Sequence, residues 1–107
     1  MQATTTENLV NIRSFLENMT KQGFKIQQQP TQLNTMIAVG QKTDYFTRLY
    51  NTPGYYICCF RMEYNDYNMR LWLTVQSMQQ SNIGGRLLEI VNSADLGKVT
   101  TVLENYK

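Results

Sequence analysis

The first hydrophobic pattern along the chain has a spacing of three and four residues and covers residues 6–21. This spacing places side chains on one face of an α-helix, so it predicts an amphipathic helix. Thr4 and Glu7 fit a capping box at its start, and Thr6 is an alternative cap. Gly23 fits a left-handed stop at its end. The hydrophobic stripe consists of Leu9, Ile12, Phe15, Leu16 and Met19.

After this helix the hydrophobic spacing changes to runs and alternations typical of strands. The sequence Asn51-Thr52-Pro53-Gly54 has the composition of a turn, because proline presets one turn torsion and glycine permits positive φ. A hairpin loop is expected at 64–68. Connections without helices favour an antiparallel meander over parallel pairing. The predicted strands lie near 24–29, 33–41, 44–50, 54–64 and 69–78.

The strand near 69–78 indicates which sheet face belongs to the core. Its alternate residues Met69, Leu71, Leu73 and Val75 are hydrophobic and are expected to face inward. A hairpin partner gives the same core its more hydrophobic set, which is Tyr56, Cys58, Phe60 and Met62. The opposite face then carries Tyr55, Ile57, Cys59, Arg61 and Glu63 beside Arg70 and Trp72. A register slip of one residue would exchange these two sets.

The C-terminal quarter of the chain is harder to interpret. Ile83, Leu87, Leu88 and Val91 have a spacing that predicts a second helix over 82–93. The tail 95–107 fits either a helix or a β-branched strand, with the helix favoured. We therefore expect one α+β domain over residues 1–107. It would contain an N-terminal helix, an antiparallel meander of four to five strands, and one or two C-terminal helices.

Composition narrows the function classes only modestly. The chain has 107 residues, 17% of them charged, and a formal net charge of +2. Such a balance does not require a nucleic-acid or membrane partner. No 18-residue apolar run is present, and the first residues do not have the pattern of a secretory signal. The neighbouring Cys58 and Cys59 would point to opposite faces of a strand, so we interpret both as reduced thiols of a cytoplasmic protein.

Catalytic chemistry is not indicated by the residue types. The chain contains no histidine, which removes the commonest general base and metal ligand. Two cysteines alone do not make a structural zinc site. No two carboxylates converge on one pocket by their spacing. We expect a protein without enzymatic activity, cofactor or metal.

The remaining candidate is the sheet face that carries aromatic and arginine side chains. Tyrosine, tryptophan and arginine dominate the binding energy of protein interfaces, so this face predicts a protein-interaction module, with a homodimer as one form of it. The expected partner-binding residues are Tyr55, Ile57, Arg61, Arg70 and Trp72. The alternative is a single-stranded nucleic-acid-binding protein that uses the same face. Its stacking residues would come from Tyr45, Phe46, Tyr50, Tyr55 and Trp72, with phosphate contacts from Arg48, Arg61 and Arg70.

Two short segments resemble those of a known group of proteins. They are Phe15-Leu-Glu-Asn-Met-Thr-Lys-Gln-Gly-Phe-Lys-Ile26 and Leu87-Leu-Glu-Ile-Val-Asn92. They are similar in style to the opening helix-to-strand segment and the late helix of the small chaperone-like α+β proteins of the YbjN and type III secretion chaperone group. Secretion chaperones tend to be acidic, whereas this chain is slightly basic. The resemblance implies a non-catalytic dimer that holds another protein.

Overall fold

The first helix, α1 (Thr5–Lys21), ends in a left-handed stop at the predicted glycine. Gly23 has a φ of 104°, and its N–H donates to the carbonyl of Thr20 at 3.1 Å. The next N–H, of Phe24, donates to the carbonyl of Met19 at 3.0 Å. These two bonds form a Schellman motif, which satisfies the last carbonyls of the helix. The chain therefore leaves α1 sharply and enters the sheet within a few residues.

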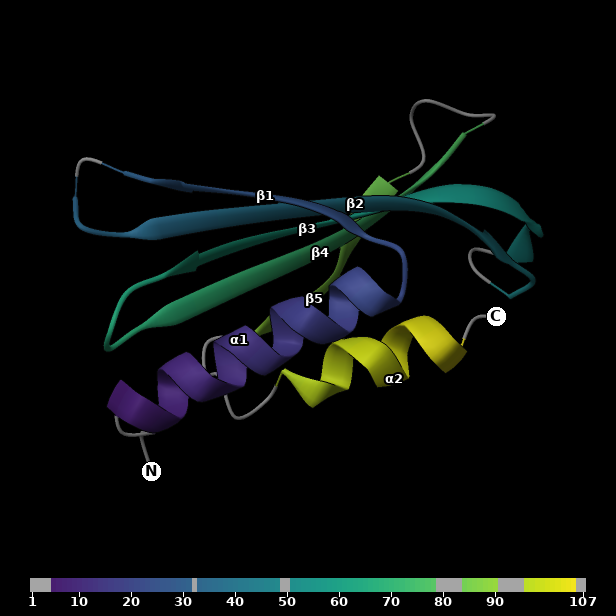
Figure 1. Cartoon of the computed structure of the whole chain (residues 1–107). Coiled ribbons are helices and arrows are strands. Elements are labelled where there is room, and N and C mark those ends of the chain that lie inside the picture. The colour runs from purple at the N-terminus through teal and green to yellow at the C-terminus, as the bar shows by residue number, and fades with distance from the viewer. Residues whose placement is uncertain (1–4, 32, 49–50, 79–83, 91–95, 106–107) are drawn as a thin grey trace.

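The computed structural model describes residues 5–31, 33–48, 51–78, 84–90 and 96–105. A five-stranded antiparallel sheet follows α1 in the order β1-β2-β3-β4-β5, so neighbours in sequence are neighbours in space. Both helices lie on one face of this sheet (Figure 1). The predicted α+β fold is confirmed. The remaining elements are β1 (Lys25–Pro30), β2 (Met36–Phe46), β3 (Gly54–Tyr64), β4 (Met69–Ser77), β5 (Gly84–Ile90) and α2 (Gly97–Asn105).

One hairpin connection shows the turn chemistry expected of it, and a second differs from the expectation. Between β3 and β4, the side-chain oxygen of Asn65 accepts hydrogen bonds from the N–H groups of Tyr67 and Asn68, each at 2.8 Å. Between β2 and β3, the left-handed residue is Asn51, with a φ of 54°, rather than Gly54. Asparagine tolerates this conformation better than most residues with a side chain.

Two elements differ from the prediction. The predicted strands 33–41 and 44–50 form a single strand, β2, although residues 49–50 lie outside the described residues. The helix predicted over 82–93 is wrong within the described residues, because 84–90 form β5, paired with β4. The register shifts between Leu73 and Thr74 of β4, which pair with Leu88 and Arg86 of β5, so β5 contains one extra residue at this point. The helix favoured for the tail is confirmed as α2.

The core lies between the helices and the sheet, as the alternation predicted. Phe60 of β3 is at its centre, and its ring packs against Phe15 of α1 and Phe24, with centroid distances of 5.4 Å in both cases. Gly40 of β2 lies opposite Phe60 in the register, so the ring occupies the space of the absent side chain. Other buried core residues include Ile12, Leu16, Met19, Tyr56, Cys58, Met62, Met69, Leu71, Leu73, Val75, Leu96, Val99 and Leu103.

Candidate functional site

The sheet face turned away from α1 and α2 is called the open face here. In the described parts of the chain, no helix or strand covers it (Figure 1). The strands β1 to β4 present alternate residues on it, and the register aligns these residues in cross-strand rows. Its residues are Lys25, Gln27, Gln29, Ile37, Val39, Gln41, Thr43, Tyr45, Tyr55, Ile57, Cys59, Arg61, Glu63, Arg70, Trp72, Thr74 and Gln76.

One end of the open face carries a compact group that we call the arginine–tryptophan cluster: Arg61, Glu63, Arg70 and Trp72. Arg61 lies directly opposite Trp72, and Glu63 directly opposite Arg70, in the β3–β4 register. The Arg61 guanidinium donates to the Glu63 carboxylate through Nε at 3.1 Å and Nη2 at 2.9 Å. The Arg70 guanidinium lies 4.7 Å from the centre of the Trp72 ring. The cluster therefore combines a half-buried indole with two arginines whose positions are constrained by neighbours.

The other end of the open face carries a tyrosine pair. Tyr45 of β2 and Tyr55 of β3 are cross-strand neighbours, with ring centroids 5.2 Å apart and an edge-to-face angle of 73°. Both rings are partly exposed, at 46% and 59%. Ile57 lies half-buried between this pair and the cluster. Since a strand rises about 3.3 Å per residue, Tyr55 and Arg61 lie roughly 20 Å apart along β3.

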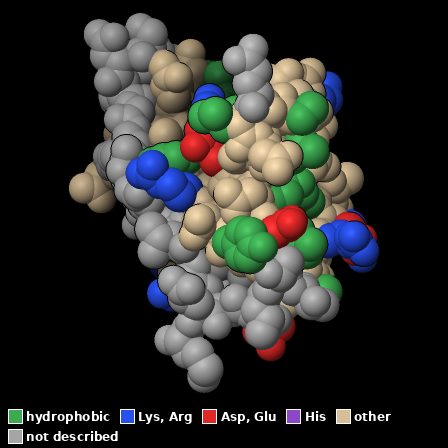
Figure 2. Space-filling model, turned by 90° about the vertical axis from the view of Figure 1, so that its left-hand side faces the viewer, with side chains coloured by type: hydrophobic (Ala, Val, Ile, Leu, Met, Phe, Trp, Pro, Cys, Tyr) green, Lys and Arg blue, Asp and Glu red, His purple; other side chains and the backbone are tan. Residues whose placement is uncertain are grey.

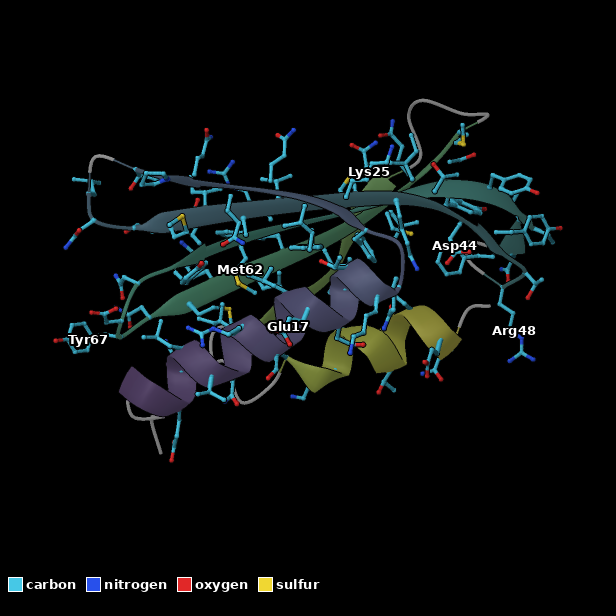
Figure 3. All side chains as sticks on the ribbon, in the orientation of Figure 1. Glu17, Lys25, Asp44, Arg48, Met62 and Tyr67 are labelled. Carbon is cyan, nitrogen blue, oxygen red and sulfur yellow. The ribbon has the colours of Figure 1, made fainter. Side chains whose placement is uncertain are left out.

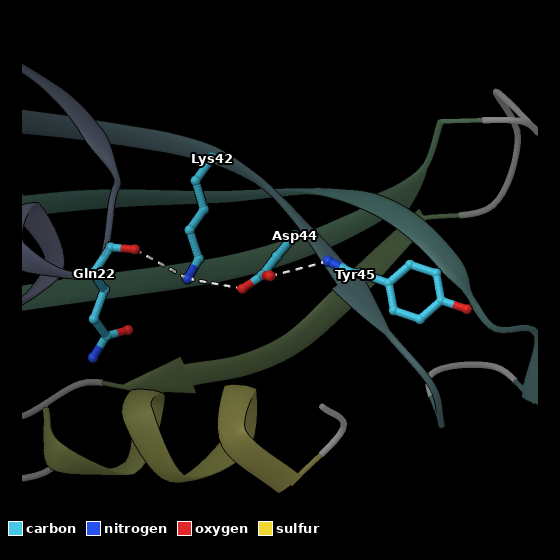
Figure 4. A network of polar contacts seen from close by, with 4 residues as sticks. All are labelled: Gln22, Lys42, Asp44 and Tyr45. Carbon is cyan, nitrogen blue, oxygen red and sulfur yellow. Dashed lines mark hydrogen bonds and ion pairs between the residues drawn. The ribbon is translucent and has the colours of Figure 1, made fainter.

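A partly buried polar network lies at the strand end that presents the tyrosine pair (Figure 4). Lys42 is on the helix side of β2, and its side chain is only 7% exposed. Its ammonium group contacts the Asp44 carboxylate at 3.0 Å and donates to the carbonyl of Gln22 at 3.5 Å. It also lies 4.9 Å from the centre of the Phe24 ring. Asp44 in turn accepts a hydrogen bond from the N–H of Tyr45 at 3.0 Å, so the network joins the end of α1 to the backbone at the tyrosine pair.

The structure places all five predicted partner-binding residues on the open face. It brings Arg61, Arg70 and Trp72 into one cluster, whereas Tyr55 and Ile57 lie toward the opposite end. Sequence reasoning missed the contribution of β2, which adds Ile37 and the 41% exposed Val39 to this surface. The signal was present in the alternation of residues 37–45, but it was hidden because that segment was divided into two strands.

The expected nucleic-acid stacking residues lie only partly on this face, which carries Tyr45, Tyr55 and Trp72. Phe46 is buried, and its ring packs against Tyr56 with centroids 6.0 Å apart. Arg48 is exposed at the end of the molecule opposite Tyr67 (Figure 3). Tyr50 lies outside the described residues. Stacked bases need flat aromatic surfaces in a row, and one face of Trp72 is occupied by Arg70.

Charges of both signs are dispersed on the described surface. Figure 2 shows the end of the molecule that carries Tyr67, where acidic, basic and hydrophobic side chains are interspersed with uncharged polar ones. On the open face the described cations are Lys25, Arg61 and Arg70, and Glu63 is paired with one of them. A polyanion favours a concentrated basic surface, and the described residues of the open face do not form one.

The two thiols have different environments. Cys58 faces the core and is buried, whereas Cys59 is half-buried on the open face. Burial raises the pKa of the Cys59 thiol above its ordinary value of 9.0, so the thiol stays protonated at neutral pH and is a weak nucleophile. Among the described residues, no group of three or more cysteine, aspartate or glutamate side chains is placed to hold a metal ion.

Comparisons with known proteins do not assign a family. No protein-family model, no curated protein and no solved structure matches the chain. Neither of the described helices is long and apolar enough to cross a membrane. One of the two segments that resemble the chaperone-like group differs from expectation, because 87–90, expected to be helical, belong to strand β5.

Proposed function

We propose that this chain is a non-enzymatic protein-interaction module, chaperone-like or adaptor-like, which binds a partner protein through the open face. One observation carries the proposal: the arginine–tryptophan cluster and the tyrosine pair lie on a sheet face that no described element covers. Tyrosine, tryptophan and arginine are the residues that contribute most binding energy in protein interfaces. The reduced thiols further suggest a cytoplasmic location.

The residues beside the cluster, and between it and the tyrosine pair, also support a protein partner. Ile37, Val39 and Ile57 supply exposed or half-exposed hydrophobic surface, and glutamine and threonine residues surround them. Protein interfaces combine a hydrophobic centre with a polar rim and contain few charged residues at the centre. A second copy of this chain is one such partner, and in that case the open faces of two copies would meet.

The test compares binding by open-face variants and a matched control. We expect Trp72→Ala and Arg70→Ala to weaken capture of partner proteins from cells that express the chain, or to dissociate a dimer in light scattering. Glu104→Ala, an exposed change on α2, should leave either interaction unchanged. Tyr55→Ala provides a second open-face variant that removes a ring 59% exposed, so it separates loss of binding from loss of folding. Retention of the same partners by all open-face variants would contradict the proposal.

Single-stranded nucleic-acid binding is the second candidate, because Arg70 and Trp72 are together on an open surface. Trp72 is the sole tryptophan of the sequence, so its fluorescence reports on this cluster alone. Nucleic-acid binding predicts quenching by an oligonucleotide and a steep loss of affinity as salt rises. Absence of quenching at low salt would remove this candidate and leave the protein partner.

A further inference from the structure

Strand β1 forms one edge of the sheet, and its middle residues carry no edge-protecting side chain. Within the described residues its single strand neighbour is β2, and the register between them is unbroken over all six residues. Native edge strands are commonly protected by lysine or proline, by a bulge, by short length or by a covering segment. In β1 such residues are confined to the two ends, Lys25 and Pro30, and residues 26–29 between them are uncharged and keep their backbone N–H groups. Its outer backbone groups are therefore placed to pair with another strand.

A groove runs beside β1 on the helix side. It has a volume of about 410 Å³ and lies between α1 and the strand. Ile26 and Gln28 of β1 border it, and the Tyr64 hydroxyl donates to the Gln28 side-chain oxygen at 2.9 Å. A smaller hollow of about 240 Å³ shares Leu9 and Tyr64 with the groove and extends it toward the β1–β2 turn. The α1 side of the groove consists of Leu9, Ile12, Arg13, Leu16, Glu17 and Thr20.

A second hollow lies at β1 and includes residues of the opposite sheet face. It has a volume of about 360 Å³ and is lined by Gln27, Gln28 and Gln29 of β1 together with Ile37 and Val39 of β2. Successive side chains of a strand point to opposite faces. A strand added beside β1 would therefore direct alternate side chains toward the α1 groove and toward this hollow. The same edge thus offers both backbone pairing and space for side chains.

We propose that β1 binds an extended segment of a partner protein, which adds to the sheet as an antiparallel strand. The segment places hydrophobic side chains at alternate positions in the α1 groove, against Leu9, Ile26 and Tyr64. Its other side chains are uncharged and polar, because glutamines dominate the opposite hollow. A carboxylate near its C-terminal end would lie opposite Lys25 and complement its charge. Backbone pairing supplies affinity in such complexes, and the alternate side-chain pockets supply specificity.

The edge favours a peptide segment over a second copy of the chain. Stable protein interfaces involve about 20–30 residues on each side, whereas β1 has six residues. The rim residues Arg13 and Glu17 have opposite charges, so the groove has no excess charge that would attract a polyanion. The hollow shares Gln27, Gln29, Ile37 and Val39 with the β1–β2 side of the open face, but the site does not include Arg70 or Trp72 and does not depend on the function proposed for them.

The experiment starts with a phage-displayed library of random ten-residue peptides, which is selected for binding to the full chain. The enriched peptide is then synthesised with a fluorescent label and used as the probe. We expect an alternating hydrophobic and polar sequence, and slower hydrogen exchange of the amides at 25–30 when the peptide is bound. A control peptide with N-methyl groups on alternate amides cannot pair with a strand edge and should bind at least about tenfold more weakly. Gln28→Lys should cause a similar loss, whereas Trp72→Ala on the open face should not.

Three results would overturn the proposal. The first is the absence of any enriched peptide, or enrichment of peptides without the alternation. The second is protection of β3 and β4 amides instead of those at 25–30, which would direct the peptide to the open face. The third is a dimer in light scattering that Gln28→Lys dissociates, which would identify a second copy as the occupant. Ile26→Ser provides an additional groove variant, and thermal unfolding of each variant separates a binding defect from misfolding.

Discussion

The replacement of Gly40 by alanine tests the packing of the sheet against α1. A Cβ atom at this position would lie 2.0 Å from Cε2, 2.4 Å from Cζ and 2.8 Å from Cδ2 of the Phe60 ring. The ring cannot move away easily, because Phe15 and Phe24 pack against it with centroid distances of 5.4 Å. Added methyl groups in a well-packed core cost about 1–3 kcal/mol. We expect the upper part of this range for Gly40→Ala, because three ring atoms are involved.

The assay is urea unfolding at equilibrium, followed by circular dichroism and by Trp72 fluorescence. A loss of about 2–3 kcal/mol corresponds to a fall in the melting temperature of roughly 10–20 °C for a domain of this size. Gly54→Ala is the matched control, since a Cβ there meets no atom within 4 Å, and it should change stability by less than about 0.5 kcal/mol. The double variant Gly40→Ala/Phe60→Leu should recover part of the loss. A Gly40→Ala protein as stable as the original chain would refute this account of the core.

Three further predictions concern charged and titratable groups. Lys42→Met removes the ion pair to Asp44 and should lower the free energy of unfolding, measured with urea, by about 2 kcal/mol. An unchanged urea midpoint would show that the ion pair contributes nothing to stability. Intact-mass measurements after iodoacetamide treatment should show that Cys59 reacts in the native protein, with a pH midpoint above 9.0. Cys58 should react only when the protein unfolds, and simultaneous reaction of both thiols would contradict their placement. Because burial raises the pKa of Cys59 and of the Tyr64 phenol, their contribution to stability is complete below about pH 9 and is lost as pH rises through the folded-state values. Thermal unfolding between pH 8 and 11 should show this decline in stability. A rise in stability over this pH range would contradict the prediction.

The local pattern predicted the fold wherever one face of an element is buried. The alternation in β4 and the hydrophobic set of β3 identified the core face correctly, because a register slip would expose every core residue of a strand. The spacing of α1 and its stop at Gly23 were equally direct signals. These elements are specified by neighbours close in sequence or by a burial pattern of period two.

The two wrong predictions, a break within β2 and a helix in place of β5, have causes in the tertiary structure. Lys42 and Thr43 interrupt the hydrophobic run in β2 and were interpreted as a break between strands. The strand continues there because the Lys42 ammonium is satisfied by Asp44 and by the carbonyl of Gln22, at 20 residues' distance in sequence. For β5, the adjacent leucines 87 and 88 and their neighbours gave a helical spacing, but pairing with the edge of β4 outweighed it, and the register irregularity accommodates the extra residue.

For the candidate site, too, the sequence predicted what local alternation determines and missed what depends on tertiary contacts. Alternation placed Tyr55, Ile57 and Arg61 on one face. It did not show that Arg61 lies opposite Trp72, or that Arg70 stacks on the indole, because cross-strand alignment depends on the hairpin register. The contribution of β1 and its groove had no signal in the hydrophobic pattern, since a groove between a helix and an edge strand arises from their packing alone.

Site-specific photo-cross-linking tests the central claim about the open face most directly. A photoreactive amino acid would replace Tyr55 on the open face or, as the control, Glu104 on α2, in cells that express the chain. We predict a discrete cross-linked protein species at position 55 that is absent at position 104 and is reduced by Trp72→Ala. Cross-links of equal strength at both positions, or none at position 55 while the protein remains folded, would contradict the assignment of the open face as the binding surface.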